Sequence, residues 1–156
     1  MFKPFLRLVQ FGGLAFVLGG CLFDGFGAGI PDVPSIKDDE PYVRALLDSN
    51  GMKDVPLYEI LKAENFSEHL VTYYIALQKR GLTSFRFIES VKNIKTISTI
   101  RLDSNSITQV PPGILNKKWT GLLLNGNELC NLSQQDSANL EASGALWKNT
   151  QYCTNK

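Results

Sequence analysis

Apolar residues in the second half of the chain follow a spacing that repeats. In each unit, two apolar residues flank one variable position, and an asparagine follows three residues after the second of them. Alternation with a period of two predicts a short strand with one buried face, and the asparagine predicts a turn. The two clearest units are Ile97-x-x-Ile100-x-Leu102-x-x-Asn105-x-Ile107 and Trp119-x-x-Leu122-x-Leu124-x-x-Asn127-x-Leu129.

Two weaker units precede them. Residues 47–56 share six of ten residues with residues 102–111, and residues 72–85 keep most of the apolar positions but have Arg80 where an asparagine is expected. We therefore expect about four coils, two of them irregular. Their reference residues, Asn50, Arg80, Asn105 and Asn127, lie 30, 25 and 22 residues apart.

The longer early spacings leave room for short helices between the strands. Apolar residues at helical spacing predict a helix over residues 56–63. Ser67 is a candidate cap for a second helix that contains Leu70 and Val71, and residues 87–94 suggest a third. Residues 111–115 are expected to be 3₁₀ or extended.

The repeated pattern resembles the leucine-rich repeat, L-x-x-L-x-L-x-x-N-x-L with a period of about 20–29 residues. The resemblance implies an α/β solenoid of about four coils over residues 41–132, with a parallel β-sheet on its concave face. A single coil cannot bury its own apolar edge, so the coils must stack. A small α+β domain with two similar turns is the alternative architecture.

Residues 1–20 have the layout of an export signal, in which Lys3 and Arg7 precede an uncharged, mostly apolar run. Leu18-Gly19-Gly20-Cys21 resembles the lipobox of bacterial lipoproteins. That resemblance implies cleavage before Cys21, lipidation of its sulfur with acyl chains such as palmitate, and attachment to the cell envelope. Because Leu22 rather than Asp follows, the outer membrane is the expected site. An uncleaved membrane anchor and an ordinary secretory leader are the alternatives. Residues 21–40, rich in Gly and Pro, are expected to form a flexible tether.

The remaining two cysteines, Cys130 and Cys153, lie near the end of the chain. An exported chain enters a compartment that permits disulfides. If Cys21 is lipidated, these two thiols remain and can pair with each other. Ser133-x-x-Asp136 predicts a helix over about 134–142. Residues 133–156 thus resemble the cysteine-closed caps of extracellular leucine-rich repeat proteins. Metal binding by the two cysteines is the alternative.

Charge and composition argue against several function classes. The net charge of the 156 residues is +1, and removal of residues 1–20 leaves 14 basic and 15 acidic side chains, so we expect no nucleic-acid partner. His69, the only histidine, stands beside Glu68 with no nucleophile motif nearby. Without an acid–base constellation we expect no enzymatic activity, and we expect no cofactor and no metal site.

The repeat register assigns the outward-facing residues of the strands to three columns. Tyrosine and arginine, the residue types that often carry interface energy, occur among them. We therefore expect a protein-interaction surface, for a ligand or for adhesion, with the partner unidentified. A structural envelope protein that packs against other envelope components is the alternative, and so is a solvated face with no partner. The columns are Arg44, Tyr74, Thr99 and Gly121; Leu46, Ala76, Arg101 and Leu123; and Asp48, Gln78, Asp103 and Asn125.

Overall fold

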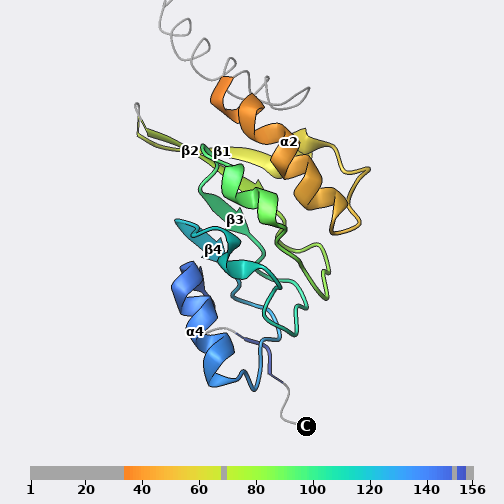
Figure 1. Ribbon diagram of the computed structural model, residues 1–156, viewed down its shortest axis with the longest axis vertical. Helices are drawn as coiled ribbons and strands as arrows, with labels where there is room; N and C mark the ends of the chain where they lie inside the picture. Colours follow the sequence, from red (N-terminus) through yellow and green to blue (C-terminus); the bar gives the residue numbers. More distant parts are fainter. Residues whose placement is uncertain (1–33, 68–69, 149–150, 154–156) are drawn as a thin grey trace, which may run out of the picture.

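The computed structural model describes residues 34–67, 70–148 and 151–153. The elements follow one another along the long axis of the molecule in chain order, with helix α2 at one end and helix α4 at the other (Figure 1). The expected signal peptide, Cys21 with most of the expected tether, and His69 lie outside the described residues.

The first element among the described residues is α2, Pro34–Asp48. A proline is tolerated in the first turn of a helix, because the N–H groups there have no intrahelical acceptor. The helix corrects two expectations: residues 34–40 are not a tether, and residues 42–48 do not form the strand of a first coil. The reason is the spacing of the buried residues, which recur every three or four positions and so fit one face of a helix. These are Ile36, Asp39, Val43, Leu46 and Leu47.

The next three elements also differ from expectation. Helix α3 is one turn, Leu57–Ile60, and strand β1, Leu61–Ser67, begins where the helix was expected to continue. Strand β2, Leu70–Ala76, replaces the helix expected after Ser67. In β2, Tyr73 and Ile75 face the core while Thr72 and Tyr74 alternate with them. This is the period of a strand, and β-branched and aromatic residues favour it.

The C-terminal elements match the expectations closely. The short helices η1, Glu89–Asn93, and η2, Ile114–Asn116, are 3₁₀. Strands β3, Thr99–Arg101, and β4, Gly121–Leu123, lie in the two clearest units. Helix α4, Gln134–Ser143, begins after the predicted cap Ser133, whose hydroxyl accepts a hydrogen bond from Asp136 N. Strand β5, Ala145–Leu146, was not predicted.

The strands form one five-stranded sheet in the order β1-β2-β3-β4-β5, antiparallel between β1 and β2 and parallel elsewhere. Ile75, Ile100 and Leu122 are paired across neighbouring strands and are fully buried. They belong to a single apolar core that lies on one side of the sheet. The sheet is therefore mostly parallel, with one face buried and the other available to solvent.

Candidate interaction surface

The outward face of the parallel strands carries the predicted second column in register. Ala76 pairs with Arg101, Arg101 with Leu123, and Leu123 with Leu146. In the first column, Tyr74 pairs with Thr99 and Thr99 with Gly121. The repeat register therefore placed the outward residues of β2, β3 and β4 in the correct columns. Leu146 extends the second column by one strand and was missed.

Arg101 lies at the centre of this face. Its guanidinium carbon is 5.7 Å from the centroid of the Tyr74 ring, within the range of a cation–π contact. Its Nε is 3.5 Å from Asp103 Oδ1, and the Arg101 side chain is about one-third exposed. The guanidinium is thus held between an aromatic ring and a carboxylate, and it still reaches solvent with part of its surface.

The third column is polar. Gln78, Asp103 and Asn125 follow the strands, and their chain segments are joined by hydrogen bonds from Lys79 N to Asp103 O and from Ser104 N to Asn125 O. The side chain of Asp103 is mostly buried, and the Gln78 Oε1 atom is buried without a hydrogen-bond partner. The third column therefore borders the second with amide and carboxylate groups.

Three predicted residues do not belong to this surface. Arg44, Leu46 and Asp48 lie in α2, and none of them pairs with a strand. Arg44 Nη1 donates to Lys53 O and Val55 O, and so fixes the loop after the helix. Leu46 is fully buried in the core. Their assignment to the outward columns is wrong, because the apolar pattern of residues 36–47 is that of a helix.

A hollow of about 700 Å³ opens at the C-terminal end of the outward face. Leu123 and Asn125 of the predicted columns line it together with residues 144–148 and Glu141. Leu146 is 62% exposed, and Lys148 Nζ forms an exposed ion pair with Glu141. The hollow combines aliphatic and indole surface with an ion pair, which suits a side chain or segment without net charge. Leu146, Trp147 and Lys148 were not predicted on this surface, because a two-residue strand after a helix has no detectable periodicity.

Buried side-chain amides hold the turns that follow the strands. Asn105 Nδ2 donates to Leu102 O in its own turn and to Leu77 O in the preceding one, at 2.9 Å each. Its Oδ1 accepts from Arg80 N and Leu82 N. Asn127 does the same one turn later, donating to Leu124 O and Leu102 O and accepting from Ile107 N. The two asparagines thereby fix the spacing between successive strands.

Gln151 continues this ladder and was not predicted. Its Nε2 donates to Trp147 O and Leu124 O, and its Oε1 accepts from Leu129 N. These contacts correspond to those of Asn127, one strand further along. The signal in the sequence is a Trp147-x-x-x-Gln151 spacing, one residue longer than Leu124-x-x-Asn127, and the longer glutamine side chain spans the difference.

The predicted disulfide between Cys130 and Cys153 is confirmed, with a Cα–Cα distance of 5.8 Å. Tyr152 N also donates to Asn127 O, so the segment that contains Gln151 is held by a backbone hydrogen bond next to the disulfide. The covalent link therefore keeps the end of the chain against the last turn of the ladder.

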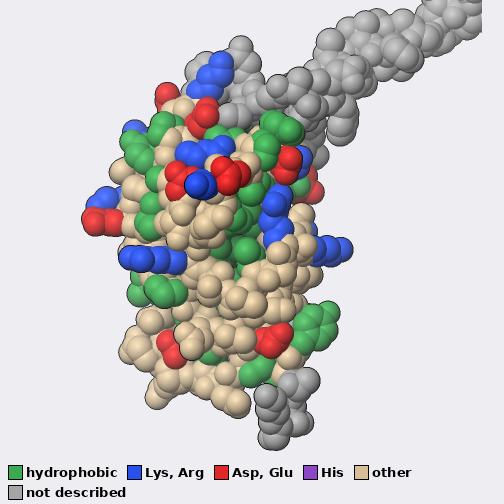
Figure 2. Space-filling view, turned by 90° about the vertical axis from the view of Figure 1, so that its right-hand side faces the viewer, with side chains coloured by type: hydrophobic (Ala, Val, Ile, Leu, Met, Phe, Trp, Pro, Cys, Tyr) green, Lys and Arg blue, Asp and Glu red, His purple; other side chains and the backbone are tan. Residues whose placement is uncertain are grey.

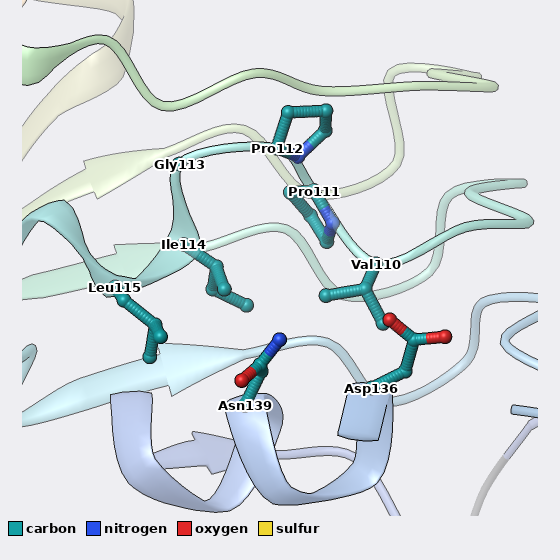
Figure 3. A pocket seen from close by; sticks show the side chains of 8 residues that line it. All are labelled: Val110, Pro111, Pro112, Gly113, Ile114, Leu115, Asp136 and Asn139. Carbon is teal, nitrogen blue, oxygen red and sulfur yellow. The ribbon is translucent and has the colours of Figure 1, made fainter. Parts of the chain in front are cut away.

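A second, smaller hollow of about 340 Å³ lies between residues 110–115 and α4. Figure 3 shows Asn139 and Asp136 of α4 facing Ile114, Leu115 and Val110 across it. Leu115 is 54% exposed here. This hollow lies outside the predicted columns.

Charge is unevenly distributed on the side of the molecule that Figure 2 shows. Side chains of both signs gather over the half nearer α2, and few lie over the half nearer α4. Lys117 is a partly buried cation whose Nζ donates to Ile94 O and lies 5.2 Å from the centroid of the Trp119 ring. Burial lowers the pKa of Lys117, and the nearby charge of Asp39 partly opposes that shift. On this side, the described residues form no large patch of a single sign.

Two structural findings concern other kinds of site. None of the described helices combines the length and the apolar character that crossing a bilayer requires. Within residues 34–67, 70–148 and 151–153, no three His, Cys, Asp or Glu side chains are grouped so that they could hold a metal ion. No family model, curated protein or solved structure matches this chain.

Proposed function

We propose that this chain is a lipid-anchored protein of the bacterial cell envelope whose short leucine-rich repeat array presents its sheet to a protein partner. The lipobox at Cys21 supports the anchor. The chain-ordered strands and the ladder of Asn105, Asn127 and Gln151 support the repeat array, because they recur with the period of the sequence pattern. With a helix at each end, the array has three parallel strand levels after the β1–β2 hairpin.

The observation that carries the interaction surface is the second column together with its hollow. Arg101, Leu123 and Leu146 stand in register on one rigid face, next to Tyr74 and the 700 Å³ hollow. Tyrosine and arginine side chains such as Tyr74 and Arg101 are enriched at interaction hot spots, and the neighbouring leucines add apolar surface that excludes water. Such a surface would bind a partner through non-covalent contacts, and the half-buried Asn125 at its border offers an amide for hydrogen bonding.

Site-specific photo-crosslinking in the producing cells tests the surface. A photoreactive residue at Leu146 should give one adduct of defined mass that the Arg101→Glu substitution removes. The same residue at Leu115, beside the smaller hollow, is the matched control. Adducts from Leu115 but not from Leu146 would instead favour a structural protein that packs against other envelope components. No discrete adduct at either position would contradict both roles.

Intact mass of the native protein tests the anchor separately. We expect the mass of residues 21–156 plus acyl chains, less two hydrogens for the Cys130–Cys153 bond. Retention of residues 1–20, or a Cys21 without acyl chains, would refute the lipoprotein assignment. Neither result would affect the crosslinking outcome.

A further inference from the structure

We propose that the outer edge of β1 pairs, antiparallel, with β1 of a second copy of this chain. Among the described residues β1 has β2 on one side and no strand on the other. It is a seven-residue strand, and an edge strand of that length presents a row of unpaired backbone N–H and C=O groups. The proposal concerns this edge alone and does not depend on the proposed interaction surface.

The charges of β1 fit its own copy. Lys62 pairs with Tyr74 and Glu64 with Thr72, so both charged side chains stand on the outward face, on either side of Ala63. A two-fold axis at Ala63 places Lys62 of each copy opposite Glu64 of the other. A charged edge usually opposes pairing because most strands do not neutralise it. In this register each charge meets its opposite, which favours cross-strand pairing.

The side chains are free to make these contacts. Glu64 is exposed, and Lys62 Nζ makes one exposed hydrogen bond, to Tyr58 O at 3.2 Å. An ammonium group has three donors, so Lys62 keeps two for a carboxylate of the second copy. Both residues therefore reach across without breaking a buried contact.

An exposed aromatic side chain adjoins the same edge. Tyr58, just before β1, is 38% exposed. In the proposed register Leu61 of one copy lies opposite Asn65 of the other, so association brings Tyr58 of each copy next to β1 of the other copy. It would also join two five-stranded sheets into one continuous sheet, doubling the outward face.

A cysteine at the axis tests the register. In the full-length chain, Ala63→Cys treated with a short bis-maleimide should give a dimeric adduct at least tenfold above that of Thr83→Cys. Thr83 is an exposed loop residue and serves as the matched control. Cys21 is present in both variants and is controlled by the unmodified chain. An Ala63→Cys adduct no stronger than that of Thr83→Cys would overturn the proposal.

Charge reversal tests the pairing independently. In the Ala63→Cys background, Lys62→Glu and Glu64→Lys should each lower the adduct roughly tenfold, since both symmetric pairs become repulsive. The double reversal should restore it. A double variant that behaves like the singles would refute the register. Circular dichroism and the intact Cys130–Cys153 bond report folding of each variant, and sedimentation of the unmodified chain in detergent should give a dimer. A monomer at high concentration would also overturn the proposal.

Discussion

The amide of Asn105 joins two turns: its Nδ2 donates to Leu77 O and Leu102 O, and its Oδ1 accepts from Arg80 N and Leu82 N. Alanine cannot replace any of these hydrogen bonds, and the side chain of Asn105 is buried. We expect Asn105→Ala to lower the free energy of unfolding by about 3 kcal/mol, because buried backbone groups lose their partners. Urea denaturation measures the change. Thr108→Ala, at an exposed position in the same turn, should change it by less than about 0.5 kcal/mol. Equal effects from the two variants would refute the role of the ladder.

Asp39 performs a similar task at the other end of the molecule. Its carboxylate is buried and accepts hydrogen bonds from Lys95 N, Thr96 N and Ile97 N, at 2.7 to 2.9 Å. The Asp39 carboxylate thereby links helix α2 to the backbone segment that precedes β3. An amide of the same shape presents only one accepting oxygen.

Asp39→Asn should therefore destabilise the fold by about 2 kcal/mol. The neighbouring Asp38 is exposed, so Asp38→Asn is a matched control that removes the same charge. We expect thermal unfolding to show a lower melting temperature for Asp39→Asn only. If both variants melt together, the effect is one of net charge and the hydrogen bonds contribute little.

Some of these residues could be predicted from the sequence and others could not. Asn105 and Asn127 occupy a repeated position, and repetition identifies them. Asp39 lies in an acidic run that predicts a solvated linker, and only the packing of α2 buries it. Gln151 performs the same task as the asparagines, but with a longer side chain and a longer spacing, which hides it from a pattern search.

The same contrast holds for whole elements. The strands β3 and β4 were predicted because their apolar spacing is regular and local. Segment 47–56 shares six of its ten residues with segment 102–111, yet Leu47 lies in the last turn of a helix whereas Leu102 follows a strand. The difference lies upstream, since Ile36 and Val43 continue a helical stripe that has no counterpart before Leu102. Short sequence identity therefore predicted a turn, and tertiary packing decided the element before it.

The disulfide controls the last element of the ladder. Its two cysteines are 23 residues apart, and a loop of that length contributes about 3 kcal/mol in the chain-entropy model. We expect the double variant Cys130→Ser, Cys153→Ser to lose about that much stability. It should also expose two amides to exchange: Leu129 N–H, bonded to Gln151 Oε1, and Tyr152 N–H, bonded to Asn127 O.

Hydrogen exchange under native conditions separates this local effect from global loss. Leu102 N–H, which donates to Leu123 O, lies inside the sheet and should exchange only through global unfolding. The free energy of exchange at Leu102 should fall by the lost global stability alone, whereas the free energies of exchange at the two cap amides should fall further. Uniform acceleration of all three would show that the cap does not open separately.

At the scale of the whole molecule, the core is continuous. The buried apolar residues form one cluster that runs from Ile36 in α2 to Leu140 in α4. Each strand contacts its neighbours in the sheet, α2 packs against η1, and α4 packs against η2 and β5 (Figure 1). A stack this short has no internal boundary where the apolar contacts stop, so its ends and its centre should unfold together.

Cooperative unfolding can be tested with a tryptophan that lies outside α2. Trp119 is 2% exposed and packs near Phe87, and in a Trp147→Phe background it is the remaining tryptophan. Ile36→Ala removes a buried side chain in α2 and should lower the free energy of unfolding by about 3 kcal/mol. The urea midpoints from Trp119 fluorescence and from circular dichroism should fall together and by the same amount. Asp38→Ala, exposed on the same helix, should move neither midpoint. If Ile36→Ala moves the dichroism curve while the Trp119 curve stays in place, α2 unfolds independently and the core is not one cooperative unit.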